Sequence, residues 1–304
     1  MRYAIIGTGA IGGYYGCKLA KSGKDVHFLL HRDYDYVLKH GIQVDSCDES
    51  FHLDKLNVYN DISSMPKCDV VLVCLKSTNN CLLEQFIPLI VNDDTLVVLV
   101  QNGIGLEYDV QQKFPQLPLA AGLAFICCAK TQPGRVNHQC YGSINIGNYS
   151  CKNQLQINQV IHDLRNAGID ANEVEYNEAR WKKAVWNMPF NGLTVALNTQ
   201  TNLLLQNTFT HKLVKDIMLE VITAARLLGV NNIDETFADK MIEMTIKMTP
   251  YSPSMKLDYD FKRPMEIYYL YTRPIVEAAK AGFQMKKLEM LEAELRYLSQ
   301  NNAI

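Results

Sequence analysis

The segment Tyr3-Ala-Ile-Ile-Gly7-Thr-Gly-Ala-Ile-Gly12, close to the first residue, is the strongest indication of how the chain folds. Its first four residues predict a short buried strand, and the residues after Gly12 predict a helix that ends near Gly23. Between them, Gly7 permits a tight turn, Gly9 lets the backbone approach a pyrophosphate, and Gly12 allows the helix to pack closely on the strand. The alternative is a strand–helix turn without a ligand. We predict a dinucleotide site at this turn and the helix N-terminus, formed by Gly7, Thr8, Gly9, Ala10, Ile11 and Gly12.

Further apolar runs in the first half predict more strands of the same sheet. Residues 26–30, 69–75 and 95–100 are apolar runs bounded by polar residues, a pattern typical of parallel strands buried on both faces. Segments of helical length separate them, so the connections are predicted to be helical crossovers. Residues 134–149 predict a closing hairpin, and residues 153–167 a helix that stops at a glycine.

After about residue 173 the pattern changes to amphipathic helices. We therefore predict an α/β fold, with a doubly wound, Rossmann-type parallel sheet domain over residues 1–172 that binds NADP. An all-α domain over residues 173–304 follows and is predicted to carry the substrate and the catalytic residues.

Composition excludes several classes of protein. Lys and Arg total 30 and Asp and Glu total 32, so the formal charge is −2, which argues against a nucleic-acid partner and a polybasic membrane anchor. The nine cysteines are odd in number and contain no Cys-x-x-Cys pair, which favours reduced thiols in the cytoplasm. The longest apolar run, residues 117–129, is too short to cross a bilayer. No His or Cys cluster has metal-ligand spacing, so we predict no metal.

The end of the second predicted strand bears on the choice of cofactor. A site for NAD expects Asp or Glu there to hold the ribose hydroxyls, but this chain reads Leu30-His31-Arg32. A guanidinium at this place can pair with the extra phosphate of NADP. We predict that His31 and Arg32 bind this phosphate, while the neighbouring Asp33 leaves an NAD-type contact open.

Two polar residues follow buried strands, at the edge of the sheet where ligands gather. Lys76 and Asn102 are both predicted to face the cofactor. Gly103 and Gly105 beside Asn102 would let the loop approach a ring closely. The alternatives are a surface lysine at the start of a loop and a plain Asn-Gly turn.

Residues 180–198 predict a largely buried helix with a polar stripe. Lys183, Asn187 and Asn191 recur every four residues and share one face. Burying a cation and two amides is costly unless they are satisfied, and a small polar substrate would satisfy them. A partly desolvated lysine has a lowered pKa and can act as a general acid. The alternative is a structural polar seam, and Pro189 is expected to kink the helix.

A second segment carries a carboxylate after a proline. Pro264 suits the first position of a helix, which would place Glu266 in the first turn. A carboxylate is favoured there by the helix dipole, so spacing alone favours a capping role over a catalytic one.

Taken together, these motifs resemble the ketopantoate reductase family, from the opening glycines to about Glu266. The resemblance is carried by Gly7-x-Gly9-x-x-Gly12, Leu75-Lys76, Gln101-Asn102-Gly103-x-Gly105, Trp181-x-Lys183-x-x-x-Asn187-x-x-x-Asn191, and Ser254-Met-x-x-Asp258 through Arg263-Pro-x-Glu266-Ile. The chain departs from the family at His31, where an arginine is usual, so Arg32 is a shifted candidate for the phosphate.

The resemblance implies NADPH-dependent reduction of ketopantoate to pantoate, on the route to pantothenate and coenzyme A. It implies Lys183 as general acid, Glu266 as a ligand of substrate hydroxyls, and Asn187, Asn191 and Ser254 as further substrate contacts. Asn102 and Lys76 would lie near the nicotinamide and the substrate, with Asn102 and Glu266 touching both ligands. Two alternatives stay open: a reductase of another 2-oxo or 3-hydroxy acid, and a non-catalytic NADP-binding sensor. The sequence also leaves a homodimer open, and residues 268–271 are predicted to be core.

Overall fold

The computed structural model describes residues 1–250 and 252–302. The chain divides into two compact units. The α/β unit comprises Met1–Gln101 and Leu106–Tyr176, and the helical unit comprises Asn102–Gly105 and the chain from Asn177 onward. The division therefore lies four residues beyond the expected residue 172, because the strand β10 (Ala171–Val174) pairs with a strand of the α/β unit.

The α/β unit is built on one ten-stranded sheet in the order β4-β3-β9-β8-β7-β6-β1-β2-β5, with β10 beside β9. The strands other than β10 are β1 Arg2–Ile6, β2 Asp25–Leu29, β3 Ile42–Ser46, β4 Phe51–Leu53, β5 Asn57–Tyr59, β6 Cys68–Val73, β7 Val91–Leu99, β8 Leu119–Gln132 and β9 Arg135–Asn148. Strands β5, β2, β1, β6, β7 and β8 run parallel, which confirms the predicted doubly wound sheet. The pairs β3–β4 and β8–β9 are antiparallel, so the complete sheet is mixed.

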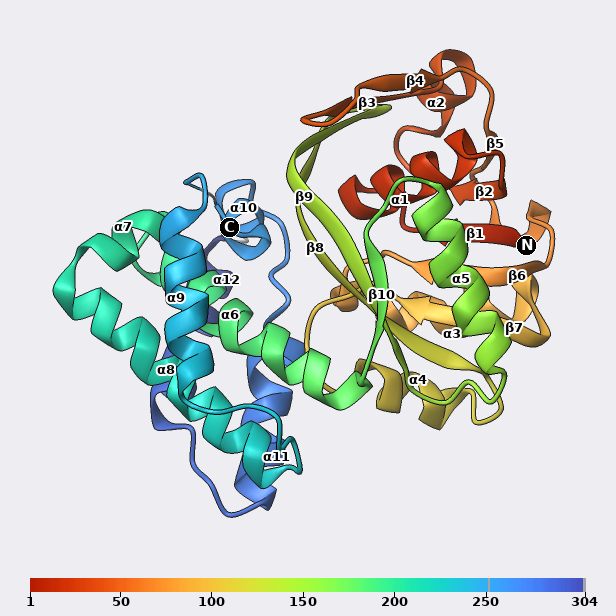
Figure 1. Ribbon diagram of the computed structural model, residues 1–304. Helices are drawn as coiled ribbons and strands as arrows, with labels where there is room; N and C mark the ends of the chain where they lie inside the picture. The colour runs from red at the N-terminus through yellow and green to blue at the C-terminus, as the bar shows by residue number, and fades with distance from the viewer. Residues whose placement is uncertain (251, 303–304) are drawn as a thin grey trace. The chain divides into compact units, whose positions relative to one another are not determined.

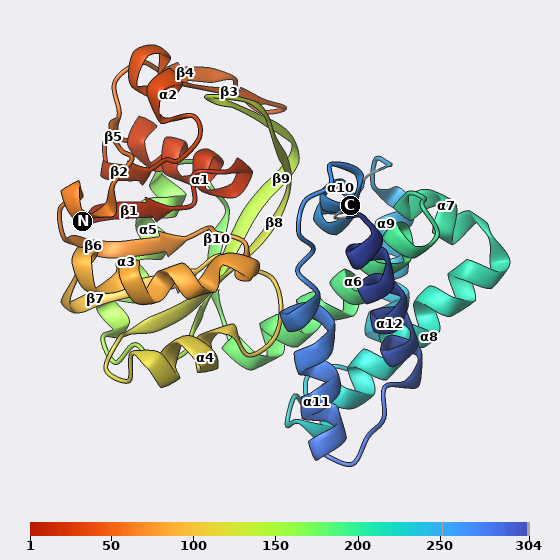
Figure 2. The same cartoon turned by 180° about the vertical axis from the view of Figure 1, so that it is seen from behind.

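Helices cover both faces of this sheet. They are α1 Ala10–Lys21, α2 Tyr34–His40, α3 Leu83–Ile90, α4 Leu106–Lys113 and α5 Gln154–Asn166, with short turns η1 Ile62–Ser64 and η2 Ser77–Leu82. Figures 1 and 2 show α5 and α3 on opposite faces, and α1 contacts α5. Because both faces are covered, the apolar runs of β1, β6 and β7 are almost completely buried, as their sequence predicts.

The helical unit contains α6 Tyr176–Ala196, α7 Thr201–Gln206, α8 Thr208–Leu227, α9 Thr236–Lys247, α10 Ser254–Asp260, the π-turn η3 Tyr268–Thr272, α11 Arg273–Lys280 and α12 Lys286–Asn302. Helix α6 continues through Pro189, and its buried residues include Trp181, Val185 and Met188. Of residues 268–271, Tyr271 is fully buried and its hydroxyl donates to the Met188 carbonyl at 2.8 Å, whereas Tyr268 is exposed. The predicted core assignment therefore holds for only part of this stretch.

The predicted helix start at Pro264 is wrong. Residues 263–266 are non-helical, and the helix begins at Ile267. The residue before a proline is biased against the helical conformation, and here the Arg263 N–H already closes the end of α10 by donating to the Asp258 carbonyl at 2.7 Å. Glu266 therefore precedes the helix instead of lying in its first turn.

Among the described residues, no helix has the length and apolar character that crossing a bilayer requires.

Candidate active site

The glycine-rich turn between β1 and α1 is fixed by close packing at two of its glycines. Gly7 has φ +96°, and a Cβ there would lie 2.5 Å from the backbone nitrogen of Leu75. A Cβ at Gly12 would lie 2.4 Å from the carbonyl oxygen of Gly7. These glycines are therefore required by the turn itself. The Thr8 hydroxyl donates to the Leu29 carbonyl at 2.9 Å and ties the turn to the end of β2.

Gly9 differs from both, because a Cβ there would meet no atom within 4 Å. It is the N-cap of α1 and brings no side chain to the helix N-terminus. Protein packing does not explain a glycine at this position. Open space at a helix N-terminus, where backbone N–H groups point outward, suits a phosphate.

This contrast predicts different effects for two alanine substitutions. If the turn binds NADPH as the sequence predicts, Gly9→Ala is expected to raise the dissociation constant for NADPH about tenfold, because the added methyl group would enter the open space where the pyrophosphate is expected. The free energy of unfolding of Gly9→Ala should fall by less than about 1 kcal/mol, the usual effect of changing an N-cap residue. Gly12→Ala should destabilise the fold by about 1–3 kcal/mol through overpacking. Fluorescence titration with NADPH and thermal unfolding separate the effects, and unchanged NADPH affinity in Gly9→Ala would contradict the assignment.

The residues after β2 separate into an exposed pair and a buried acid. His31 and Arg32 are exposed, whereas Asp33 is buried. The Asp33 carboxylate forms an ion pair with Lys130 of β8 and accepts the Gly134 N–H at 3.4 Å. The Lys130 ammonium also donates to the Thr8 carbonyl at 3.0 Å. Lys130 was not predicted from the sequence, since it lies almost a hundred residues beyond Asp33.

Lys76 lies at the start of η2, where its carbonyl accepts the Asn79 N–H at 2.8 Å. The loop before it is held by Gln101, which is buried two residues beyond β7 and was recognised from the sequence only as part of a motif, without a role. The Gln101 amide donates to the Leu75 carbonyl at 2.7 Å and to Asn80 Oδ1 at 2.7 Å. The backbone that carries Lys76 is therefore fixed beside the glycine turn.

The loop Asn102–Gly105 belongs to the helical unit. The Ile104 N–H donates to the Tyr269 carbonyl at 2.9 Å, and a Cβ at Gly103 would lie 2.5 Å from Cβ of Tyr269. A Cβ at Gly105 would likewise lie 3.2 Å from Cγ of Arg273. Packing within the helical unit is therefore enough to explain these glycines, without the predicted close approach to a ligand ring. They let the loop pack on the helical unit, which places Asn102.

Lys183 lies on α6 in a setting that changes its acidity. The pKa of Lys183 is lowered to about 7, mainly by burial and also by the positive charge of Arg180, while Glu266 acts in the opposite direction. Arg180 lies one turn before Lys183 on α6 and is buried, as is Glu266. An ammonium group with a pKa near neutrality can both donate and recover a proton, as the predicted general acid must.

The two asparagines of the α6 stripe have different environments. The Asn191 amide donates to the Asn187 carbonyl at 2.9 Å, and Asn191 Oδ1 accepts the Met255 N–H at 3.2 Å. Asn191 therefore holds the first turn of α10, which begins at Ser254. Asn187 is buried as a residue, with 7% of its surface exposed, and no hydrogen bond within the part of the chain that the structure describes involves its carboxamide. Asn187 is thus the stripe residue that a ligand would satisfy, whereas Asn191 positions Ser254.

The structure thus places the predicted residues in two groups. The α/β unit carries the glycine turn, His31, Arg32 and Lys76, joined through Thr8, Leu29 and Leu75. The helical unit carries Lys183, Asn187, Asn191, Ser254 and Glu266 together with Asn102.

Comparisons with known proteins agree on one family. A family model described as "Ketopantoate reductase PanE/ApbA" matches residues 3–150, and one described as "Ketopantoate reductase PanE/ApbA C terminal" matches residues 175–298. A 2-dehydropantoate 2-reductase from Nostoc sp. is 42% identical over 99% of this chain and 96% of that protein. The crystal structure of 2-dehydropantoate 2-reductase from Geobacter metallireducens GS-15 has a TM-score of 0.94 and 37% identity, covering 98% of this chain and 99% of that one.

The same fold occurs in a D-mandelate dehydrogenase, whose ternary structure holds NADH and anilino(oxo)acetate. Its TM-score is 0.90 with 22% identity over the full length of both chains, a likeness that concerns the fold alone. The family models and the Nostoc relative span both units, including the glycine turn and the Lys183 helix. The chain therefore belongs to the ketopantoate reductase family.

Proposed function

We propose that this chain is an oxidoreductase that reduces 2-dehydropantoate (ketopantoate) to pantoate with NADPH, in the biosynthesis of pantothenate and coenzyme A. The observation that carries the proposal is Lys183, whose pKa is lowered to about 7 beside Glu266 in a member of this family. A residue with this acidity is suited to a reaction that needs one proton at neutral pH.

In the proposed reaction NADPH supplies a hydride, with its two electrons, to the carbonyl carbon of the 2-oxo acid. Lys183 donates a hydrogen bond from its ammonium group to the carbonyl oxygen and transfers the proton as the alkoxide forms. The C=O π bond breaks, a C–H and an O–H bond form, and Lys183 recovers a proton from solvent. Stabilising negative charge as it develops is the main contribution that a fixed cation makes.

Other residues of the helical unit would orient the substrate. The Asn187 carboxamide, which has no partner among the described residues, and the Ser254 hydroxyl at the start of α10 would bind the carboxylate or hydroxyl of the acid. Glu266 would accept a hydrogen bond from the substrate hydroxyl. Asn191 would act on the substrate through Ser254, whose helix it holds.

The residues after β2 support NADPH as the preferred cofactor. The Asp33 carboxylate is occupied by Lys130 and by the Gly134 N–H, so it is poorly placed to accept ribose hydroxyls. The exposed His31 and Arg32 supply the positive charge that a 2′-phosphate needs. The solved structure of the D-mandelate dehydrogenase contains NADH, so the fold by itself does not decide this preference.

Arg32→Ala tests this preference. It should raise KM for NADPH by about 10–100-fold, since a hydrogen bond to a charged group contributes about 1.5–3 kcal/mol. The KM for NADH should change little. Arg135→Ala is a matched control, because Arg135 is a half-exposed arginine that pairs with Asp45. Equal effects of Arg32→Ala on both cofactors would contradict a role at the 2′-phosphate.

The main alternative is the same chemistry on another small 2-oxo acid. NADPH oxidation should be followed by absorbance with ketopantoate and a panel of 2-oxo acids, including phenylglyoxylate. The highest kcat/KM is expected for ketopantoate, and a higher value for another acid would reassign the substrate. Tight NADPH binding without turnover of any acid would favour the non-catalytic sensor.

We also propose a cytoplasmic enzyme that forms a homodimer. A dimeric ketopantoate reductase from Staphylococcus aureus shares the fold, with a TM-score of 0.83 and 20% identity. The odd number of cysteines and the lack of a Cys-x-x-Cys pair support a reducing compartment. Light scattering of the purified protein should give twice the chain mass of 34.5 kDa.

A further inference from the structure

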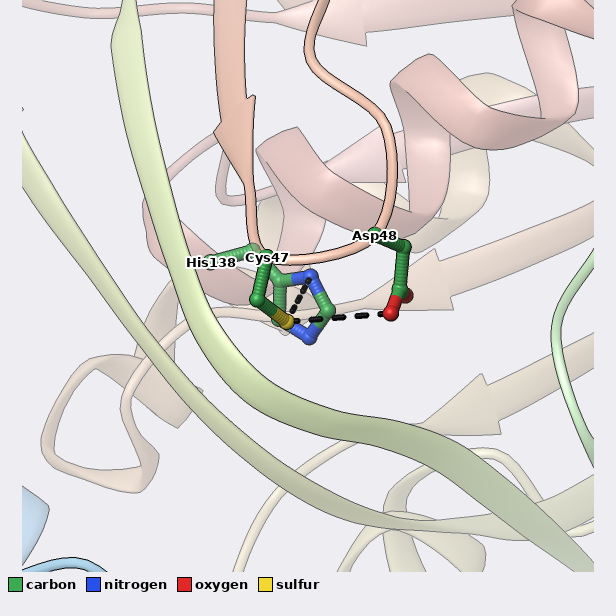
Figure 3. Close-up of side chains that lie close together, drawn as sticks. All are labelled: Cys47, Asp48 and His138. Atoms are coloured by element: carbon green, nitrogen blue, oxygen red, sulfur yellow. Dashed lines mark hydrogen bonds between the residues drawn. The ribbon is translucent and has the colours of Figure 1, made fainter.

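A second group of reactive side chains lies in the α/β unit, on the strand pair β3 and β9. These strands are parallel, with Ser46 opposite His138, and the Cys47 N–H donates to the His138 carbonyl at 3.0 Å. This pairing brings Cys47 and Asp48, just past the end of β3, to the His138 side chain (Figure 3). About ninety residues separate the two segments, so no motif with metal-ligand spacing exists in the sequence.

The hydrogen bonds of His138 fix its tautomer. Nε2 lies 2.9 Å from the Tyr141 carbonyl oxygen, which can only accept, so Nε2 carries the proton. The lone pair of Nδ1 then faces Ser46 Oγ at 2.8 Å and Cys47 Sγ at 3.8 Å. The ring is almost completely buried and packs against the Tyr14 ring, with centroids 4.4 Å apart and the ring planes tilted by 44°, so packing limits its orientation. A histidine that donates one N–H to a carbonyl and presents the other nitrogen has the arrangement typical of a metal ligand.

The three ligand atoms have spacings close to those of a coordination sphere. Cys47 Sγ lies 3.8 Å from His138 Nδ1 and 3.8 Å from Asp48 Oδ1, and all three atoms lie within 4.8 Å of one another. Bonds of about 2.0–2.3 Å in tetrahedral geometry place neighbouring zinc ligands about 3.5 Å apart. The two 3.8 Å spacings exceed this value by only a few tenths of an ångström, and the exposed Cys47 and Asp48 are the side chains that would rotate to close the site.

We propose that Cys47, Asp48 and His138 form a zinc site, with water as the fourth ligand. Thiolate, imidazole and carboxylate together suit Zn²⁺ better than Mg²⁺ or Ca²⁺, which prefer oxygen ligands alone. On binding, the Cys47 thiol releases its proton to solvent, and the Ser46 hydroxyl gives up its bond to Nδ1. The metal would tie the end of β3 to β9. This site is separate from the residues proposed for the reaction, so either proposal can fail without the other.

Cobalt is the probe for this site, because a thiolate ligand gives Co²⁺ a strong charge-transfer absorption. The full-length, reduced protein should bind one Co²⁺ with this absorption, and Zn²⁺ should displace it. Cys47→Ser should abolish the charge-transfer band. Cys81→Ser is the matched control, since Cys81 is also exposed and free, and it should keep the band. A missing band in the parent protein, or a band retained in Cys47→Ser, would overturn the proposal.

Two further variants probe the carboxylate ligand and the serine that competes for Nδ1. Asp48→Ala should weaken Co²⁺ binding at least tenfold while leaving the protein folded, because Asp48 is exposed. Ser46→Ala removes the competing hydrogen bond to Nδ1 and should leave Co²⁺ affinity unchanged or increase it. Zn²⁺ should raise the Tm of the parent and of Ser46→Ala, but not of Cys47→Ser. Loss of binding in Cys140→Ser, with binding retained in Asp48→Ala, would place the metal elsewhere.

Discussion

Lys183→Ala is expected to lower kcat for ketopantoate reduction by about 10²–10⁴-fold, the usual contribution of a positioned general acid. The reason is the loss of the proton donor at the carbonyl oxygen. Affinity for NADPH should be unchanged, because the residues proposed to bind the nucleotide lie mainly in the α/β unit. Steady-state kinetics and NADPH fluorescence titration measure the two quantities separately.

Lys182→Ala is the matched control for this prediction. Lys182 is the preceding residue of α6, but its ammonium group forms an ion pair with Glu178 and lies over the Phe237 ring. Removing it changes the total charge in the same way and should leave kcat within a few-fold of the parent value. Equal activity of Lys183→Ala and Lys182→Ala would contradict the assigned mechanism. A loss confined to Lys183→Ala would support it.

The parts of this protein that the sequence predicts well depend on local patterns. The glycine turn can be predicted because its strand, turn and helix are contiguous in the sequence. The stripe of Lys183, Asn187 and Asn191 follows from helical periodicity. The change from buried strands to amphipathic helices predicts the order of the two units. Each of these inferences needs only residues within about twenty positions of one another.

The parts that the sequence misses depend on long-range pairing. The ion pair of Asp33 with Lys130, and the approach of Cys47 to His138, are set by sheet order and register. Gly103 serves the packing of its loop on Tyr269, which cannot be inferred without knowing that the two segments meet. Periodicity places Asn191 on the same face of the helix as Lys183, but only the structure shows that its carboxamide oxygen already accepts the Met255 N–H of α10.

The second large effect concerns Glu266 and the pH dependence of the reaction. The acid must be protonated to act, so kcat/KM for reduction should fall as pH rises above the Lys183 pKa of about 7. The Glu266 carboxylate raises this pKa. Replacing it with a neutral amide in Glu266→Gln should therefore move the fall in kcat/KM to lower pH. The same substitution should reduce kcat/KM at its optimum by about 10–100-fold, because a charged hydrogen bond to the substrate contributes about 1.5–3 kcal/mol.

Arg180 acts on the same group with the opposite sign. Its charge lowers the pKa of Lys183, so Arg180→Gln should move the fall in kcat/KM to higher pH, whereas Arg180→Lys keeps the charge and should move it less. Arg180 is buried, so thermal unfolding must show that each variant is folded before its profile is compared. Opposite shifts for Glu266→Gln and Arg180→Gln identify Lys183 as the titrating group. Shifts in the same direction would mean that another group limits the reaction at high pH, since no single lysine ammonium could respond alike to losing an anion and losing a cation.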